Sequence, residues 1–323
     1  MSNHPGISVI ICTWNRSALL RTTLQSLNEQ IDDEQLDVEV IVVDNNSTDD
    51  TKTVVEEVMA HWKLGELRYA FEPQQGKQFA LNHGIRLSRH EILAFTDDDI
   101  LFPKDWISHI SHLFKDETLE LAGGKTLIVW PTCGKPNWYD PTMLAILAGV
   151  DLGDEKLHPP PAGYAPAGSN LIARRSLFNR VGGFSETHFR HMDHEFGIRC
   201  AKAQVNIAYE PSLVVYAPAA SACLTKRYFR RWSFKAGIAD DGSRDASTTT
   251  FLLAPRWMYR QLVEDLVFLI FRSFLVEKSV AFSRELRLWR TLGEITSRWY
   301  AKFRPQHHAK WLEKYSQKKK DLY

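Results

Sequence analysis

Three consecutive carboxylates, Asp97, Asp98 and Asp99, stand directly after the apolar run EILAF. Neighbouring carboxylates repel one another, and the repulsion weakens the local fold unless a cation, hydrogen bonds or water compensates it. Such oxygens are the ligands that Mg²⁺ and Mn²⁺ prefer in proteins. The triplet therefore predicts that a positively charged group lies beside it. An alternative needs no ligand, because an aspartate here can cap a helix that opens around Pro103.

The elements that must position this triplet alternate between strand and helix patterns over the first half of the chain. The apolar runs ISVIIC, VEVIVVD, LRYAFE and EILAFTDDD are each followed by a helical pattern. Continuous Val and Ile runs indicate strands that are covered on both faces, so the sheet should be mainly parallel. Ligands of such doubly wound α/β sheets bind beyond the carboxyl ends of the strands. The polar segments CTWNR, DNNS and TDDD all fall there, and we expect them to converge on one edge.

The rest of the chain differs in character from this first half. Residues 130–165 are irregular and rich in Pro, Gly and aromatic residues, and long loops of this kind are usually functional. From about residue 225 the pattern becomes helical. We therefore expect an α/β domain over residues 1–224, with halves at 1–125 and 126–224, followed by a basic helical extension over 225–323.

Charge is distributed unevenly along a composition that is ordinary for a globular protein. The 323 residues carry a net charge of +1, but residues 1–223 hold 19 Lys and Arg against 29 Asp and Glu, and the remainder holds 21 against 10. The basic end predicts an anionic partner, such as a phospholipid surface or a lipid-linked phosphate. A solvated helical face is the alternative. The longest apolar stretch, 262–276, contains three charged residues and is too short to cross a membrane, although it can lie on one.

The cysteines and the N-terminus predict the compartment. No C-x-x-C pair occurs, which is typical of reduced thiols in a cytosolic protein. The first residues contain neither a basic leader nor an apolar run long enough for a signal peptide. We expect a cytoplasmic protein that can contact the inner face of the plasma membrane, with no nucleic-acid partner.

Six motifs occur in an ordered series over roughly residues 7–240: VIICTWNR, VIVVDNNSTDDT, GKQFALNHGI, TDDD, AGSNLIARRSLFNRVGGF and HMDHEFGIRC. The series resembles the inverting family 2 glycosyltransferases of GT-A fold, in their bacterial, non-processive form. The resemblance implies a Rossmann-like domain whose first half binds the nucleotide and whose second half binds the acceptor. It also implies transfer of a sugar, with inversion, from a nucleotide-diphosphate sugar to a saccharide or lipid-linked acceptor in cell-surface glycan synthesis. A UDP-sugar is the favoured donor.

The resemblance assigns roles on the donor side. The residues expected to bind the nucleotide sugar are Thr13, Asn15, Arg16, Asp44, Lys77, Asp97 and Asp98. Asp44 can accept a hydrogen bond from the uracil imide, or it can simply cap the turn DNNSTDD. The basic position near the nucleotide falls to Lys77, or less favourably to Gln78, although lone lysines are mostly solvated. Asp99, with Asp97, is expected to hold Mg²⁺ or Mn²⁺.

On the acceptor side, the resemblance assigns the catalytic base to Asp193. An inverting transfer needs a carboxylate that removes the proton of the acceptor hydroxyl; the alternative is that Asp193 only caps a helix. Glu195 matches the second acid of the family and can orient the site or pair with Arg199. The residues expected around the acceptor or sugar are Trp138, Tyr139, Gly168, Ser169, Asn170, Glu195, Arg231 and Trp232. The two aromatic residues can stack on a sugar or pack within the protein.

Three positions depart from the family pattern. Met192 replaces the acid that usually precedes the catalytic Asp, Ala217 replaces a His that some relatives use as a metal ligand, and Tyr228 replaces the Gln of Q-x-x-R-W. The first two departures motivate an alternative in which the protein binds a nucleotide sugar and regulates a partner without catalysis. A nucleotidyltransferase is less favoured, because CTWNRS is not a Gly-rich phosphate loop. A zinc site at His188, His191 and His194 is a further, weaker alternative.

Overall fold

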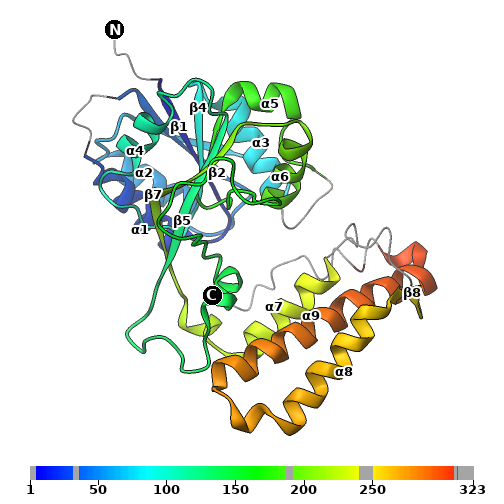
Figure 1. The fold of residues 1–323 in the computed structure, drawn as a ribbon. Coiled ribbons are helices and arrows are strands. Elements are labelled where there is room, and N and C mark those ends of the chain that lie inside the picture. The colour runs from blue at the N-terminus through cyan, green and yellow to red at the C-terminus, as the bar shows by residue number, and fades with distance from the viewer. Residues whose placement is uncertain (1–4, 32–35, 187–191, 240–249, 309–310, 312–323) are drawn as a thin grey trace. The chain divides into compact units, whose positions relative to one another are not determined.

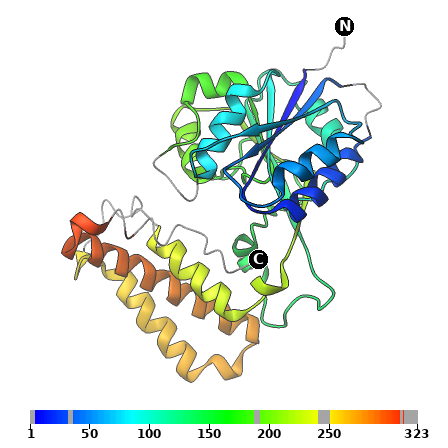
Figure 2. The same ribbon diagram turned by 180° about the vertical axis from the view of Figure 1, so that it is seen from behind.

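The computed structural model describes residues 5–31, 36–186, 192–239, 250–308 and 311. The chain forms two compact units, which Figures 1 and 2 show from opposite sides. One unit contains residues 1–129 and 148–218, and the other contains residues 130–147 and 219–323. The irregular segment 130–147 therefore clusters with the C-terminal helices. The predicted domain boundaries at residues 125 and 224 stay predictions.

The first unit is built on a seven-stranded sheet with the strand order β3-β2-β1-β4-β6-β5-β7. The strands are β1 (Ile7–Thr13), β2 (Val38–Asp44), β3 (Glu66–Phe71), β4 (Ile92–Asp97), β5 (Leu121–Val129), β6 (Leu171–Arg174) and β7 (Ile207–Pro218). All neighbouring pairs are parallel except those that β6 makes with β4 and β5. The predicted mainly parallel sheet is confirmed.

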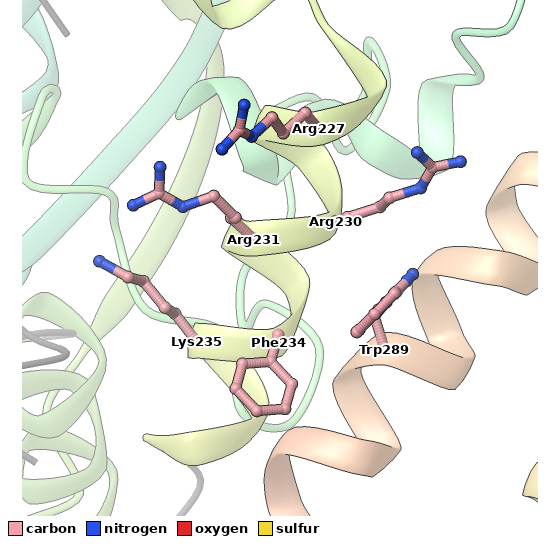
Figure 3. Close-up of a pocket in the computed structure, with 6 residues that line it drawn as sticks. All are labelled: Arg227, Arg230, Arg231, Phe234, Lys235 and Trp289. Carbon is pink, nitrogen blue, oxygen red and sulfur yellow. The ribbon is translucent and has the colours of Figure 1, made fainter. Parts of the chain in front are cut away.

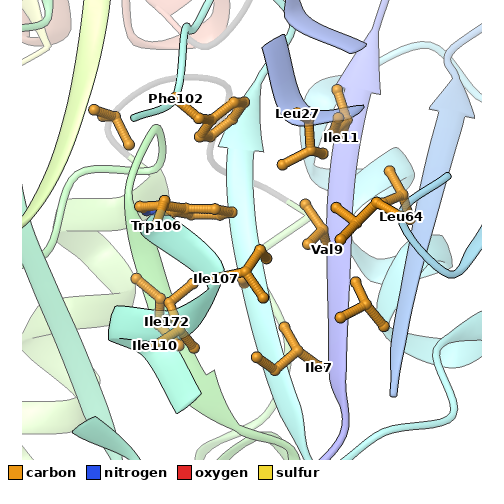
Figure 4. Packing of buried hydrophobic residues seen from close by; sticks show 14 of the residues in the cluster. Ile7, Val9, Ile11, Leu27, Leu64, Phe102, Trp106, Ile107, Ile110 and Ile172 are labelled. Atoms are coloured by element: carbon orange, nitrogen blue, oxygen red, sulfur yellow. The ribbon is translucent and has the colours of Figure 1, made fainter. Parts of the chain in front are cut away.

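Helices cover both faces of this sheet. On one face, Ile7, Val9 and Ile11 of β1 pack with α1 (Ser17–Asn28), α2 (Thr51–Met59) and α4 (Trp106–Leu113). Figure 4 shows this layer around the fully buried Trp106. On the other face, Ile10 and Cys12 pack with α3 (Lys77–Leu87), α5 (Arg175–Val181) and α6 (Met192–Lys202). Successive side chains of a strand point to opposite faces, so covering both faces requires the continuous apolar pattern of β1 and β2.

A buried carboxylate ties the amino ends of the central strands together. Glu39, near the start of β2, accepts hydrogen bonds from Ser8 Oγ at 2.6 Å, from Arg68 Nη1 at 2.7 Å and from the Arg89 backbone N–H at 2.7 Å. Burial alone would raise the pKa of Glu39, but these donors lower it below its ordinary value. The candidate site lies at the opposite, carboxyl ends of the strands.

The second unit is helical, as predicted for the C-terminal residues. Its elements are η1 (Pro141–Leu147), η2 (Ser221–Cys223), α7 (Lys226–Ile238), β8 (Thr250–Phe251), β9 (Ala254–Pro255), α8 (Arg256–Phe271), η4 (Ser273–Leu275) and α9 (Lys278–Phe303). Helix α9 packs against both α7 and α8. Within the described ranges, no helix combines the length and the apolar character that crossing a membrane requires.

Two glycines let α7 and α9 approach each other closely. A Cβ placed on Gly237 of α7 would lie 2.0 Å from the carbonyl oxygen of Arg290, and a Cβ on Gly293 of α9 would lie 2.1 Å from that of Phe234. Both distances are far below van der Waals contact, so neither position accepts a side chain unless the helices separate. The backbones therefore meet where both residues lack a Cβ.

Candidate functional site

The carboxyl ends of three parallel strands bring polar side chains together. Strand β1 ends at Thr13, which pairs in register with Asp44 of β2, and Cys12 pairs with Asp97 at the end of β4. Asp98 follows β4 directly. The three polar segments that were predicted to converge therefore meet at one edge of the sheet.

Each aspartate of the triplet contacts a cationic side chain of the protein itself. Arg16 Nη1 donates to Asp98 Oδ1 at 2.8 Å and to Asp99 Oδ2 at 2.9 Å. Lys77 Nζ forms an ion pair with Asp97. Burial raises the pKa of Asp98 above its ordinary value, and the neighbouring carboxylates add to this effect while Arg16 opposes it. Protein cations thus offset part of the repulsion between the three carboxylates.

The helix that follows the triplet is not capped by it. Helix α4 begins at Trp106, its N-cap residue is Asp105, and no side chain makes a capping hydrogen bond there. Helix capping therefore does not account for the three carboxylates.

Asp99 is the member of the triplet best suited to contact a metal ion. Its side chain is 35% exposed, against 28% for Asp97 and 6% for Asp98. Its Oδ1 atom accepts no hydrogen bond from the described residues. One or two carboxylates completed by phosphate and water oxygens make a common Mg²⁺ site, and this donor set fits that pattern.

The described residues contain no group of three or more His, Cys, Asp or Glu side chains arranged to hold a metal ion. Ala217, which stands at the position of a metal-binding His in some relatives, is buried in β7 and offers no ligand. A divalent ion at Asp99 would therefore depend on oxygens from substrate and water. The alternative zinc site cannot be placed, since His188 and His191 lie outside the described residues.

Lys77 owes its position to the loop before α3. Gly76 adopts a φ of 141°, which residues with side chains rarely adopt, and Lys77 is the first residue of the helix. Asn45 holds this loop: its Oδ1 accepts from the Gly76 N–H at 2.7 Å, and its Nδ2 donates to the Gln74 carbonyl at 2.7 Å. Burial alone would lower the pKa of Lys77, but Asp97 raises it above the ordinary value, so the ammonium stays charged.

Asp44 is buried and both of its oxygens have partners. Oδ1 accepts from the Ser47 backbone N–H at 2.9 Å, and Oδ2 accepts from the Tyr69 hydroxyl at 2.8 Å. The turn-capping alternative is thus observed, and the uracil contact stays a prediction. Asn15, with a φ of 52°, joins the same loop, because its Oδ1 accepts from the Thr48 N–H at 2.7 Å. Sequence reasoning missed Tyr69 and Asn45; the run DNNS was the available signal for Asn45.

Thr13 and Arg16 converge on one carboxylate. Thr13 Oγ1 donates to Asp98 Oδ2 at 2.9 Å, while Arg16 occupies the other oxygen. All three side chains are largely buried. Their predicted contacts with the nucleotide sugar stay predictions, but the geometry joins the loops after β1 and β4 into one rigid wall.

Asp193 lies in the first turn of α6 and faces the same edge of the sheet. Its Oδ2 accepts from the Gly168 N–H at 3.1 Å, and its Oδ1 accepts from the His194 N–H at 2.9 Å. A Cβ placed on Gly168 would lie 3.8 Å from both Asp193 Oδ2 and Lys77 Nζ. Three residues distant in sequence therefore border one small space, with a carboxylate on one side and an ammonium on the other.

Glu195 is engaged in structural contacts instead. Arg199 donates to both of its oxygens, at 2.7 and 2.9 Å, and also to the carbonyl of Gly183 at 2.7 Å. The pairing with Arg199 that the sequence allowed is thus present. Asp193 differs from Glu195 in this respect. Among the described residues, no cationic side chain lies within hydrogen-bond distance of the Asp193 carboxylate.

Ser169 and Asn170 are buried beneath the Gly168 turn. Ser169 Oγ lies 3.2 Å from Thr126 Oγ1. Asn170 Nδ2 donates to the Leu213 carbonyl at 2.9 Å, and its Oδ1 accepts from Trp106 Nε1 at 3.2 Å. These bonds anchor the turn to the sheet. The backbone of Gly168 borders the site, and sugar contacts by Ser169 and Asn170 stay predictions.

Four predicted acceptor residues lie in the second unit. Trp138 packs edge-on against Phe229 and Phe282, each at a ring separation of 5.0 Å, and Tyr139 is 7% exposed in the same cluster. Packing therefore accounts for both aromatic residues, and sugar stacking stays a prediction. Arg231 lies exposed on α7 and Trp232 is half-buried next to it.

A pocket of about 320 Å³ is formed by residues of α7 and α9, which Figure 3 labels, and we call it the cationic pocket. It is lined by Arg227, Arg230, Arg231, Phe234, Lys235 and Trp289. Arg230 is already paired with Glu285, at 2.5 and 3.0 Å. Helix α7 contains five Lys and Arg and no acid. The charge of the pocket therefore suits an anionic group such as a phosphate.

Comparisons with known proteins agree with this fold. The profile described as "Glycosyl transferase family 2" matches residues 8–180, which is more than half of the chain. Validoxylamine A glucosyltransferase of Streptomyces hygroscopicus subsp. limoneus is 35% identical, with 61% of this chain and 48% of that protein covered. Beta-monoglucosyldiacylglycerol synthase of Nostoc sp. is 25% identical, with 65% and 44% covered. The chain thus spans less than half of the length of either relative.

Solved structures extend the comparison to the whole chain. The mannosyltransferase PcManGT from Pyrobaculum calidifontis, in complex with GDP-Man and Mn²⁺, superposes with a TM-score of 0.53 at 20% identity, over 98% of this chain and 86% of that one. TarS of S. aureus in complex with UDP gives 0.51 at 17% identity, over 92% and 91%. At these identities the likeness shows the fold, and the predicted GT-A fold is confirmed. Together with the family profile, it shows that the chain belongs to glycosyl transferase family 2.

Proposed function

We propose that the protein transfers a sugar from a nucleotide-diphosphate sugar to an acceptor hydroxyl, with inversion at the anomeric carbon. One observation carries the proposal: Asp193 Oδ2 and Lys77 Nζ border the same space beside Gly168. This space lies at the carboxyl ends of the strands, next to the Asp97–Asp99 triplet. A carboxylate and a cation that border one space can serve the two ends of a displacement. The first accepts a proton, and the second attracts the leaving diphosphate.

On the donor side, the chain supplies two cations close to the triplet. Lys77 and Arg16 attract the pyrophosphate, and Asp44 is proposed to accept the imide N–H of uracil through a remaining lone pair. Asp99, with Asp97, would hold Mg²⁺ or Mn²⁺. When bound, the ion stabilises the negative charge that grows on the diphosphate as the sugar leaves.

On the acceptor side, Asp193 acts as the general base. The acceptor oxygen forms a bond to the anomeric carbon while the bond between that carbon and the diphosphate oxygen breaks. The hydroxyl proton passes to Asp193, a step that typically contributes ~10²–10⁴-fold in rate. The N–H groups of Gly168 and His194 hold the carboxylate in place. Glu195 is less suited to the role because Arg199 occupies both of its oxygens.

The donor is proposed to be a UDP-sugar, and the acceptor a saccharide or lipid-linked saccharide of a cell-envelope glycan. The bound nucleotides of the two structural neighbours differ, GDP-Man in one and UDP in the other, so support for uracil rests on Asp44. The cationic lining of the α7 pocket supports an acceptor that carries phosphate. Arg231 and Trp232 are the residues proposed to contact it.

A panel of nucleotide sugars tests the function. Purified protein is incubated with each donor with and without Mn²⁺, and release of the nucleoside diphosphate is measured with and without acceptor saccharides. We expect release that needs Mn²⁺, and we expect the release that depends on acceptor to fall by about two to four orders of magnitude in Asp193→Asn. Tight binding of a donor that stays intact under all conditions would instead favour the regulatory alternative that Met192 and Ala217 motivate.

A further inference from the structure

The outward face of α8 is apolar where a surface helix normally carries polar residues. From Val263 to the turn η4, seven large apolar side chains are between 48% and 74% exposed. They are Val263, Leu266, Val267, Ile270, Phe271, Phe274 and Leu275. Because they recur every three or four residues, they form one continuous stripe along the helix. The side that packs on α9 holds Met258, Leu262 and Asp265 instead.

This stripe is larger than an ordinary surface patch. A fully exposed Phe side chain presents roughly 150–250 Å², and those of Val, Leu and Ile are somewhat smaller, so the seven together expose on the order of 600–800 Å². The largest apolar patch on a typical monomer is about 300–600 Å² and is often functional. The two most exposed members, Phe274 and Leu275, lie in the turn that joins α8 to α9. The tip of a helical hairpin is therefore its most apolar point.

Charges around the stripe are predominantly positive. Both acids of α8 are paired with arginines, Glu264 with Arg260 at 2.7 Å and Asp265 with Arg284 and Arg287. Exposed Arg272 and Lys278 flank the tip, and neither forms an ion pair with the described residues. Glu277 is the one acid between them in the sequence. From residue 256 to 303 the chain carries nine Lys and Arg against five Asp and Glu.

We propose that the α8 stripe and the η4 tip insert into the interfacial region of an anionic phospholipid bilayer, with α8 lying in the membrane plane. An apolar face rimmed by Lys and Arg is the pattern of helices that bind such surfaces, and acidic headgroups complement the rim. A second copy of the chain is the less suitable occupant. In a two-fold contact between stripes the same rim cations would face one another, and the protruding tip offers no flat surface. The proposal does not depend on the glycosyl transfer proposed above.

Vesicle co-sedimentation of the full chain tests the proposal. The vesicles are phosphatidylcholine alone, or phosphatidylcholine with about one third phosphatidylglycerol, a fraction that gives a negative surface potential. The tip variant is Phe274→Ser with Leu275→Ser, and the rim variant is Arg272→Gln with Lys278→Gln. The matched control is Leu152→Ser, which makes the same kind of change at an apolar residue of the first unit that is 42% exposed.

We expect binding to the anionic vesicles only, reduced about tenfold or more by the tip variant and severalfold by the rim variant, and unchanged in the Leu152 control. Because the tip side chains are exposed, the variant should keep its melting temperature and its release of nucleoside diphosphate in the presence of a soluble acceptor. Equal sedimentation of the tip variant and the control would overturn the proposal. A second outcome would also overturn it. In that outcome the unmodified chain binds neither vesicle type and sediments as a dimer in sedimentation velocity, while the tip variant sediments as a monomer.

Discussion

Replacing Asp193 by Asn separates the proposed base from a helix cap. In the structure the carboxylate accepts two backbone hydrogen bonds, from Gly168 at 3.1 Å and from His194 at 2.9 Å. The amide keeps one acceptor oxygen and turns its NH₂ toward the other donor, so about one hydrogen bond to a charged group is lost, worth ~1.5–3 kcal/mol. Loss of the negative charge at the start of α6 adds ~0.3–1 kcal/mol. A domain stable by ~5–15 kcal/mol tolerates this change.

The expected effect on catalysis is larger. Asn cannot accept the acceptor proton, so transfer should fall by about two to four orders of magnitude, or ~2.7–5.4 kcal/mol at 1.36 kcal/mol per tenfold. The assay measures transfer with donor and acceptor saturating, at a temperature where thermal melting shows the variant to be folded. Calorimetry should find unchanged affinity for UDP, because Asp193 is not proposed to contact the nucleotide.

Glu195→Gln is the matched control for this substitution. It removes the same charge two residues away and weakens the bidentate pair with Arg199, so it should lower the melting temperature while leaving most of the transfer rate. Asn caps a helix nearly as well as Asp, so a role in capping alone would leave the Asp193→Asn variant active. If Asp193→Asn kept near-normal transfer while Glu195→Gln lost it, the two acids would exchange roles and the proposed mechanism would be refuted.

Three further substitutions test other parts of the site and the fold. Asp99→Ala should abolish transfer and remove the Mn²⁺ dependence of UDP binding in calorimetry; an unchanged metal dependence would reject Asp99 as a ligand. Gly168→Ala should fold normally, because the new methyl group meets Asp193 and Lys77 at an ordinary 3.8 Å, but it should raise the acceptor KM about tenfold by filling the space between them; an unchanged KM would show that the acceptor lies elsewhere. The pKa of Glu39 is lowered in the folded state, so its contribution to stability is complete above the ordinary pKa of about 4.3 and is lost as the pH falls through the lower folded value. Urea unfolding between about pH 3 and pH 7 should show this dependence diminished in Glu39→Gln, and identical pH profiles would contradict it.

The sheet and the position of the site could be predicted because both depend on local pattern. Continuous apolar runs identify strands covered on both faces, and parallel strands place the residues that follow them at one edge. The partners of these residues could not be predicted. Lys77 meets Asp97 because Asn45 shapes the loop before α3, and a loop closed by one side chain leaves no periodic signal.

In the second unit, too, the sequence does not predict which residues pack against one another. The stretch 262–276 is interrupted by Glu264, Asp265 and Arg272, which argues against a membrane span. The sequence does not reveal which side of α8 is covered by α9. In the structure Asp265 turns inward beneath Arg284 and Arg287, so the outward side is more apolar than the average composition indicates. Trp138 likewise packs against residues more than ninety positions away, beyond the reach of local pattern.

The close approach of α7 and α9 at Gly237 and Gly293 lies beside the cationic pocket. Phe234 and Trp289, which line the pocket from opposite helices, each lie within four residues of one of these glycines. A methyl group at either position cannot fit, since it would lie about 2 Å from a backbone oxygen of the other helix. The helices must then part, and the arginines of α7 move away from the indole of α9. Two glycines that do not line the pocket therefore control the separation of the helices that form it, and a mutational survey confined to the lining residues would overlook them.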